Sequence, residues 1–212
     1  MKIALIGATG FIGSHLLQEA LDRQHEVTAL VRRPERITAR PGVVASAVDV
    51  HDADSLVKLL VGHEAVISAF SADKGEGFYD GMVSGARAII AATKTAAVGR
   101  LLVVGGAGSL LNAEGQQLLE EPGFPENWLG GALGTREFLY MLREEPGLDW
   151  TFLCPARVIQ PGERTGRFRL GGDSLLTDDQ GQSLISLQDY AVAMIDELEN
   201  PAHSRQRFSV AY

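Results

Sequence analysis

Three glycines near the start of the chain have the spacing of a phosphate-binding turn. The segment Lys2–Gly13 reads KIALIGATGFIG, in which Gly7, Gly10 and Gly13 separate an apolar run from a helical pattern. In such a turn the first glycine allows a sharp bend, the second lets a pyrophosphate approach the backbone, and the third lets the helix pack against a sheet. The N-terminus of that helix would then offer free amides to the phosphates. Because a second strand pattern follows at 26–31, we expect a dinucleotide-binding unit rather than a tight turn alone.

The residues after the second predicted strand indicate which dinucleotide binds. NAD-selective sites of this kind carry an acid there, and it accepts hydrogen bonds from the ribose hydroxyls. This chain instead places Arg32, Arg33 and Arg36 in the segment LVRRPER. Because a guanidinium group pairs with phosphate through two parallel hydrogen bonds, the sequence predicts NADP, with NAD as the alternative cofactor. The other interpretation is that these arginines belong to a solvated loop, and Glu35 could pair with one of them.

Composition narrows the class of protein. With 212 residues and 45% hydrophobic content, the chain can bury a sizeable core. The formal net charge of −8 argues against nucleic acid or an anionic membrane as a partner. No apolar stretch reaches the roughly 18 residues of a membrane helix, and no signal peptide precedes the first strand, so we expect a cytoplasmic protein. The five histidines lack metal-site spacing, so no metal is expected, and the lone Cys154 should be a buried hydrophobe rather than a nucleophile.

Apolar runs of strand length alternate with helical patterns along the whole chain, which is typical of an α/β fold with a parallel sheet covered on both faces. Strands are predicted near 2–6, 26–31, 43–48, 64–69, 100–104, 149–154 and 206–211, and helices near 11–23, 52–61, 79–97, 132–144 and 187–199. We predict one doubly wound Rossmann domain over 1–212, with strand order 3-2-1-4-5-6 and an added C-terminal strand. Its ligand should bind at the carboxyl ends of the strands, near the point where the order reverses.

Two regions interrupt this alternation. Residues 110–133 show little periodicity and are predicted to form a long loop over a pocket rim. Residues 155–186 contain many glycines and short alternating stretches, which predict a small lobe of loops and a hairpin on the substrate side. At the end of this lobe, Ser186 is predicted to cap the last helix, with Asp189 supporting the cap.

Several motifs together resemble a known family. GATGFIG, LVRRPER, Val48-Asp49-Val50, VVGGAGS at 103–109 and Pro155 are similar to motifs of the atypical short-chain dehydrogenase/reductases. The similarity is greatest to the NAD(P)-binding subgroup that includes NADH-flavin reductases, biliverdin/flavin reductases and NmrA-like proteins. It covers essentially the whole chain. The N-terminal motifs are specific for cofactor binding, whereas the C-terminal ones mark the subgroup more than a reaction.

The resemblance implies further contacts with the cofactor. Asp49 would bond the adenine, unless it is a helix N-cap or a loop acid, and Ala69–Ser71 would lie along the ribose and pyrophosphate. Residues 105–106 would border the pocket, and residues 155–156 would pack by the nicotinamide. The complete predicted cofactor set is Gly7, Thr9, Gly10, Phe11, Ile12, Gly13, Arg32, Arg33, Arg36, Asp49, Val50, Ala69, Phe70, Ser71, Gly105, Gly106, Pro155 and Ala156.

The chain lacks the proton donor of ordinary family members, a Tyr-x-x-x-Lys pair. None of Tyr79, Tyr140 and Tyr190 is followed four residues later by lysine. General acid catalysis is typically worth roughly 10²–10⁴-fold, so alcohol and sugar-nucleotide chemistry become less favourable without it. We therefore expect direct hydride transfer to a small-molecule acceptor that spreads charge by itself, such as a flavin, a quinone or a linear tetrapyrrole.

Three residues are candidates for contacting this acceptor. Ser109 could hydrogen-bond it, or simply satisfy its own turn. Arg157 could clamp a phosphate or carboxylate on the acceptor, or pair with a nearby acid. Tyr79 could form part of an aromatic wall for a planar ring, or only pack. Two other functions remain open, a non-catalytic dinucleotide sensor of the NmrA kind and an epimerase or dehydratase acting on a nucleotide sugar. A homodimer is compatible with the sequence but not required by it.

Overall fold

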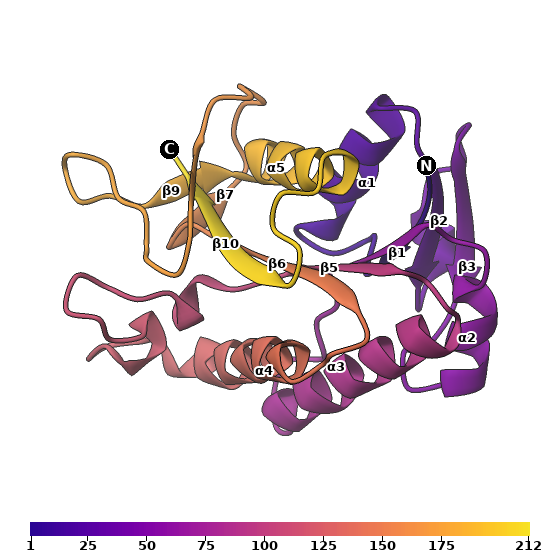
Figure 1. The fold of residues 1–212 in the computed structure, drawn as a ribbon, viewed down its shortest axis with the longest axis horizontal. Coiled ribbons are helices and arrows are strands. Elements are labelled where there is room, and N and C mark those ends of the chain that lie inside the picture. Colours follow the sequence, from indigo (N-terminus) through magenta and orange to yellow (C-terminus); the bar gives the residue numbers. More distant parts are fainter.

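A computed structural model describes all 212 residues and shows a central sheet between two layers of helices (Figure 1). The strands are β1 Lys2–Ile6, β2 Glu26–Val31, β3 Val43–Ala47, β4 Ala65–Ser68, β5 Arg100–Val104, β6 Asp149–Pro155, β7 Val158–Gln160, β8 Arg169–Gly171, β9 Leu184–Ser186 and β10 Gln206–Ala211. Eight of them form the main sheet in the order β3-β2-β1-β4-β5-β6-β10-β8. The predicted doubly wound order is therefore confirmed, and the C-terminal strand lies parallel to β6.

The strands contribute side chains to a core on each face of the sheet. Along β1, Ile3 and Leu5 belong to one buried cluster, whereas Ala4 and Ile6 belong to the other. Each of these four residues is buried. Because both faces are covered, the strand is a continuous apolar run rather than an alternation of apolar and polar residues.

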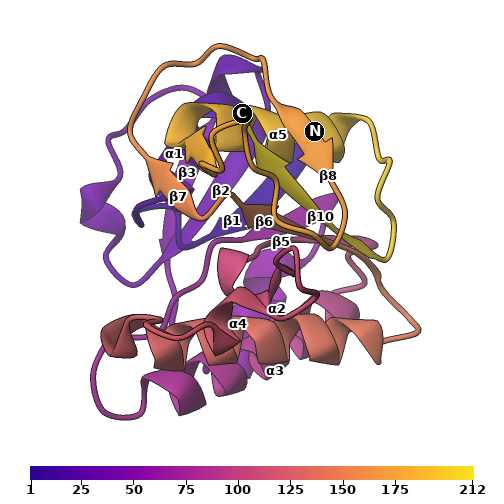
Figure 2. The same cartoon turned by 90° about the vertical axis from the view of Figure 1, so that its left-hand side faces the viewer.

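The helices cover the two faces unequally. They are α1 Gly13–Asp22, α2 Ala53–Leu60, α3 Phe78–Thr95, α4 Glu126–Arg143 and α5 Leu187–Glu199, with short 3-10 turns η1 Pro34–Arg36, η2 Ala107–Ser109 and η3 Leu118–Glu120. Helices α1 and α5 pack together on one face, and α2, α3 and α4 cover the other, as the two perpendicular views show (Figures 1 and 2). None of the five helices combines the length and the apolar character needed to cross a membrane.

Helix α4 begins six residues before the predicted position, at Glu126 instead of residue 132. Its glycines hid it in the sequence, because glycine is a poor helix former. In the structure, a Cβ atom at Gly131 would collide with the ring of Phe78, and one at Gly134 would collide with Met82. The glycines therefore let α3 approach α4 closely, and the loop predicted over 110–133 is shorter than expected.

The lobe over 155–186 contains no hairpin, so that part of the prediction is wrong. Strand β7 pairs in parallel with β9 across a long connection, and β8 leaves the lobe to pair antiparallel with β10 at the edge of the main sheet. These pairings join segments far apart in the chain, and local turn residues do not reveal them.

Helix α5 is tied to this lobe by Asp189. The Ser186 hydroxyl accepts the Asp189 backbone N–H at 2.9 Å, so the predicted N-cap is confirmed. The carboxylate of Asp189, however, does not support the cap. It accepts the backbone N–H groups of Thr165 and Gly166, each at 2.8 Å, and so holds the lobe against the helix.

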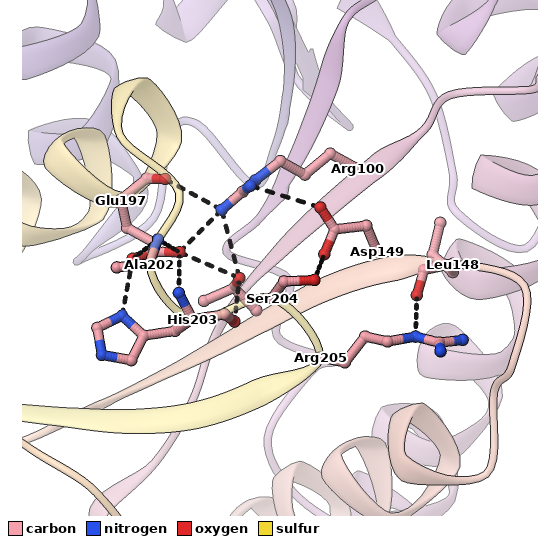
Figure 3. Close-up of polar contacts among 9 residues, drawn as sticks. Arg100, Leu148, Asp149, Glu197, Ala202, His203, Ser204 and Arg205 are labelled. Carbon is pink, nitrogen blue, oxygen red and sulfur yellow. Dashed lines mark hydrogen bonds and ion pairs between the residues drawn. The ribbon is translucent and has the colours of Figure 1, made fainter.

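A buried polar cluster joins the amino ends of β5 and β6 to the end of α5 (Figure 3). It lies at the edge of the sheet opposite the carboxyl ends of the strands. The Arg100 guanidinium donates to the Glu197 carboxylate at 2.9 Å and to the Glu197 carbonyl at 3.0 Å. Glu197 also accepts the backbone N–H of His203 at 2.9 Å. A buried charge pair needs hydrogen bonds to offset its desolvation, and those to the terminal guanidinium nitrogens supply them here, although Arg100 Nε has no partner.

Candidate functional site

A cavity of about 510 Å³ lies at the carboxyl ends of β1, β2, β3 and β4. Its wall comes from the loops that follow these four strands and from the beginning of α3. Strands β1 and β4 are neighbours at the point where the sheet reverses its order. This is the position at which ligands bind in doubly wound sheets.

The glycine turn after β1 is required by close backbone contacts. Gly7 has φ of +79°, and a Cβ atom there would collide with the carbonyl of Ala69. A Cβ at Gly13 would collide with the Gly7 carbonyl, and one at Gly10 would lie 3.2 Å from the same oxygen. Gly7 and Gly13 therefore need glycine for geometric reasons, as the sequence predicts, whereas the contact at Gly10 is tight but not prohibitive.

The same turn exposes unpaired backbone donors. Helix α1 starts at Gly13 with Ile12 as its N-cap residue and has no side-chain cap. The backbone N–H groups of Phe11 and Ile12 have no protein acceptor. Unpaired amides at a helix N-terminus, reinforced by the helix dipole, bind anions such as a pyrophosphate.

Three arginines surround the far end of the cavity. Arg32, Arg33 and Arg36 all line it, following β2. Arg33 and Arg36 have no carboxylate within 4.0 Å, whereas Arg32 donates to both carboxylate oxygens of Asp73 at 2.6 Å. Arg32 lowers the pKa of Asp73 through these hydrogen bonds and its charge. The acid that pairs with the cluster is thus Asp73 from the loop after β4, and not Glu35.

Asp49 lies at the cavity, after β3, and is held by its neighbour His51. One carboxylate oxygen accepts the His51 backbone N–H at 3.0 Å and lies 2.9 Å from His51 Nδ1. The other ring nitrogen of His51 lies 2.9 Å from the hydroxyl of Ser84 on α3. These hydrogen bonds to His51 lower the pKa of Asp49. The N-cap of α2 is Asp52, so the alternative role of Asp49 as a helix cap is excluded.

Comparison with known proteins decides the family. A family profile described as NAD(P)H-binding matches residues 7–201, almost the whole chain. The chain belongs to the NAD(P)H-binding family. The YwnB protein of Bacillus subtilis (strain 168) is 39% identical over 213 residues, which cover 99% of this chain and 98% of that protein.

Two solved structures of this fold share substantial sequence. A Bacteroides thetaiotaomicron protein, provisionally named an epimerase, is 46% identical over 100% of this chain and 96% of its own, with a TM-score of 0.93. A Streptococcus pneumoniae TIGR4 protein, provisionally named a NADH-flavin reductase, is 35% identical over 100% of this chain and 99% of its own, with a TM-score of 0.86. The predicted resemblance to an NAD(P)-binding subgroup with NADH-flavin reductases is confirmed.

The cavity gathers most of the residues that the sequence assigns to the cofactor in this NAD(P)H-binding protein. Those that line it are Gly7, Thr9, Gly10, Arg32, Arg33, Arg36, Asp49, Val50, Ala69, Phe70 and Ser71. Phe11, Ile12 and Gly13 do not line it and lie beside it, at the start of α1. The remaining four, Gly105, Gly106, Pro155 and Ala156, lie outside this cavity at the carboxyl ends of β5 and β6.

The three candidates for acceptor contact are not brought together at this cavity. Ser109 is buried in η2, where its hydroxyl lies 3.4 Å from the Gly106 carbonyl and its own carbonyl accepts Arg207 at 2.7 Å. Arg157 forms an ion pair with Glu121 at 2.8 Å. The alternatives stated for these two, a locally satisfied turn serine and a paired arginine, are what the structure contains. Tyr79 is 40% exposed in the first turn of α3.

Cys154 behaves as the sequence predicts. It is fully buried on β6, and this burial raises the pKa of its thiol to about 12. A thiol that stays protonated at neutral pH is a poor nucleophile. The chain also has no cluster of three or more His, Cys, Asp or Glu side chains arranged to hold a metal ion.

Sequence reasoning missed several residues of the cavity wall. The polar ones are His51, Asp73 and Glu76. His51 stands two residues after Asp49, so its position after a predicted strand was an available signal. Asp73 and Glu76 lie in the polar segment SADKGEG after β4, which also follows a strand. Nothing in the sequence, however, indicates that Asp73 pairs with an arginine 41 residues away.

Proposed function

We propose that this NAD(P)H-binding protein is an oxidoreductase that prefers NADPH and reduces a conjugated acceptor such as a flavin or a quinone. The observation that carries the proposal is one cavity that joins a glycine turn with free amides to three arginines after β2. The provisional name of the Streptococcus pneumoniae relative, a NADH-flavin reductase, supports the same class of reaction.

The residues of the cavity, and of the helix N-terminus beside it, fit the parts of an NADP molecule. The free amides of Phe11 and Ile12 suit the pyrophosphate, because they are unpaired donors at a helix N-terminus. The unpaired guanidinium groups of Arg33 and Arg36 suit a 2′-phosphate. Asp49 has one carboxylate oxygen that makes no hydrogen bond to the protein, and this oxygen suits the adenine amino group.

The chemistry follows from what the protein supplies and what it lacks. When bound, the reduced nicotinamide supplies a hydride to an electrophilic acceptor. Without a Tyr-x-x-x-Lys pair, the protein offers orientation and exclusion of water rather than a matched proton donor. A flavin or quinone suits such a site because its conjugated ring spreads the incoming charge. Among the acceptor candidates, Tyr79 has an accessible ring, whereas Ser109 and Arg157 would have to leave their present partners.

A steady-state assay tests the proposal. Purified protein should oxidise NADPH in the presence of FMN, riboflavin, a quinone or biliverdin, faster than a blank without protein. Oxidation no faster than the blank with every acceptor would remove the reductase function. Coenzyme binding without any turnover would instead favour a dinucleotide sensor of the NmrA kind.

One observation favours a second function. The Bacteroides thetaiotaomicron structure, 46% identical to this chain, is provisionally named an epimerase. An epimerase acting on a nucleotide sugar would need an acid or base in place of the absent pair, and Tyr79 and Lys74 are candidates near the start of α3. Loss of sugar-nucleotide turnover in Tyr79→Phe or Lys74→Met, with NADPH-acceptor activity absent in the wild type, would establish this alternative.

We also propose that the protein works in the cytoplasm, since that compartment regenerates the reduced coenzyme that the reaction consumes. Cell fractionation followed by detection of the protein tests this placement. Recovery mainly outside the cytoplasmic fraction would contradict it.

A further inference from the structure

We propose that Asp73 is a coenzyme-specificity residue, which disfavours a 2′-phosphate by occupying the guanidinium group of Arg32. The inference rests on the proposed coenzyme site and deepens it. It concerns how strictly the cavity selects NADPH over NADH.

The two residues approach the cavity from different elements. Arg32 directly follows β2, and Asp73 lies in the connection between β4 and α3. Both line the cavity, and two of the guanidinium nitrogens donate to the two carboxylate oxygens, each at 2.6 Å. The pair therefore lies across the part of the cavity where the sequence predicts the 2′-phosphate.

A phosphate and the Asp73 carboxylate compete for the same donors. Guanidinium binds either group through a planar fork of two N–H bonds, so Arg32 cannot give that edge to both. Asp73 also places a negative charge beside the site, and this charge repels a phosphate. A 2′-phosphate that binds at that edge must therefore displace Asp73, whereas NADH carries no 2′-phosphate and leaves the pair intact.

Asp73 also supplies what the end of β2 lacks. NAD-selective sites carry an acid at that end, which accepts hydrogen bonds from the ribose hydroxyls. This chain has Arg32 there. The ion pair with Arg32, however, brings Asp73 to the same place from the loop after β4. The site thus combines two free arginines that favour NADPH with one carboxylate that favours NADH, and we infer that it accepts both coenzymes.

The ion pair is accessible to an incoming ligand. The side chains of Arg32 and Asp73 are 59% and 75% exposed, and Asp73 makes no hydrogen bond other than those from Arg32. Its replacement should therefore leave the fold intact. Asp80 is a matched control, because it is an exposed acid in the first turn of α3, forms no ion pair and does not line the cavity.

Titration calorimetry with NADPH and with NADH, without acceptor, tests the inference on the wild type, Asp73→Asn and Asp80→Asn. The Asp73→Asn change should tighten NADPH binding about three- to fivefold, the upper range for an exposed ion pair. It should leave NADH binding unchanged or weaken it. Asp80→Asn should change either affinity by less than about twofold, because Asp80 is not paired with Arg32 and does not line the cavity.

A double-mutant cycle separates competition for Arg32 from a general effect of charge. When Asp73→Asn is combined with Arg32→Ala, the gain in NADPH affinity should largely disappear, because the two changes act on one contact. The gain should also shrink at high salt, since the groups are exposed. Both results support a direct exchange of partners at Arg32.

Besides unchanged affinities in Asp73→Asn, three results would overturn the inference. Weaker NADPH binding in Asp73→Asn would mean that Asp73 only holds Arg32 in position for the phosphate. An equal gain in Asp80→Asn would mean that net charge alone is responsible, and an equal gain for NADH would mean that no specificity is involved.

The outcome is separable from that of the proposed function. If Asp73→Asn shifts coenzyme affinity as expected but no acceptor is reduced, the reductase function falls and the inference stands. If the wild type reduces an acceptor with NADPH but Asp73→Asn leaves the affinities unchanged, the inference falls and the function stands.

Discussion

At the scale of single residues, the arginines after β2 differ in what they contact. Arg32 is paired with Asp73, while Arg33 and Arg36 are free of carboxylates. The types of these residues were enough to predict a phosphate site. Guanidinium groups bind phosphate, and a group of three arginines after a strand is unusual on a protein with a net negative charge. The partner of Arg32 was not predictable, because ion pairs between distant segments depend on how the loops fold.

Arg32→Ala should weaken NADPH binding by about 1.5 kcal/mol, the lower end of the range for a hydrogen bond to a charged group, because Asp73 already competes for this side chain. NADH binding should change little. Fluorescence or calorimetric titration with both coenzymes measures the difference. Arg87→Ala is the control, since Arg87 is exposed on α3, away from the cavity. Equal weakening of both coenzymes would contradict a contact with the 2′-phosphate.

At the scale of elements, α1 is joined to the lobe through a buried carboxylate. Glu19 is only 5% exposed and accepts Arg23 Nε at 2.7 Å and Arg164 Nε at 2.8 Å. Arg164 belongs to the lobe over 155–186, so the helix that follows the glycine turn is held against this lobe. The hydrogen bond from Arg164 is the main cause that lowers the pKa of Glu19 below its ordinary 4.5.

Glu19→Gln should lower the free energy of unfolding by about 1–3 kcal/mol at neutral pH, because it removes the charge that Arg23 and Arg164 contact. Since the pKa of Glu19 is lower in the folded state, its carboxylate stabilises the fold above pH 4.5. This contribution is lost as the pH falls below 4.5 through the folded pKa, so the two proteins should converge in acid. Urea unfolding at a series of pH values measures the difference.

Glu26→Gln is the control for this measurement, because Glu26 is exposed and forms no ion pair. It should change the free energy of unfolding by less than about 0.5 kcal/mol at every pH. A gap between wild type and Glu19→Gln that stays constant down to strongly acidic pH would show that the ion pairs are not its source.

Helix α3 controls one wall of the cavity through a glycine. A Cβ atom at Gly85 would collide with the ring of Phe70, which lines the cavity. Gly85→Ala should therefore displace this ring and weaken both coenzymes similarly, by about 1–2 kcal/mol, within the ordinary range for point substitutions. Calorimetric titration with both coenzymes measures the effect. Gly99→Ala, where a Cβ meets nothing within 4 Å, should leave the affinities unchanged, and unchanged affinities in Gly85→Ala would contradict a role for Phe70.

Most elements were predictable because their patterns are local. The span 187–199 is both the predicted helix and α5, and 206–211 is both the predicted strand and β10. The early start of α4 was not predictable, because its glycines serve contacts with α3 rather than its own helical propensity. Strand β8 was missed because its pairing is not local either. Its partner β10 lies at the end of the chain.

At the scale of the whole molecule, the sheet lies between two helix layers (Figure 1). The loops after four of its strands line one cavity. That arrangement follows from alternating apolar runs and right-handed crossovers, so the sequence predicted both the strand order and the edge of the sheet at which the cavity lies. The lobe over 155–186 depends on Asp189 and on pairings across the chain, and its shape was predicted incorrectly.

Because the cavity is lined by the loops after β1, β2, β3 and β4, a bound coenzyme should stabilise the whole protein. At a concentration about 100 times its Kd, a ligand that binds only the folded state adds about 2.7 kcal/mol. For a protein of this length that amounts to a rise in Tm of about 5–10 °C. Thermal denaturation with NADPH measures it, with adenosine at the same concentration as the control. No rise at saturating NADPH would contradict binding to the folded protein.

The most direct test of the account is a crystal structure of the protein with NADPH. It should show the pyrophosphate on the amides of Phe11 and Ile12, the 2′-phosphate beside Arg33 and Arg36, and the adenine next to Asp49. Crystals soaked to saturation that show no coenzyme, or that show it away from the glycine turn after β1, would contradict the central claim that this cavity is a dinucleotide site.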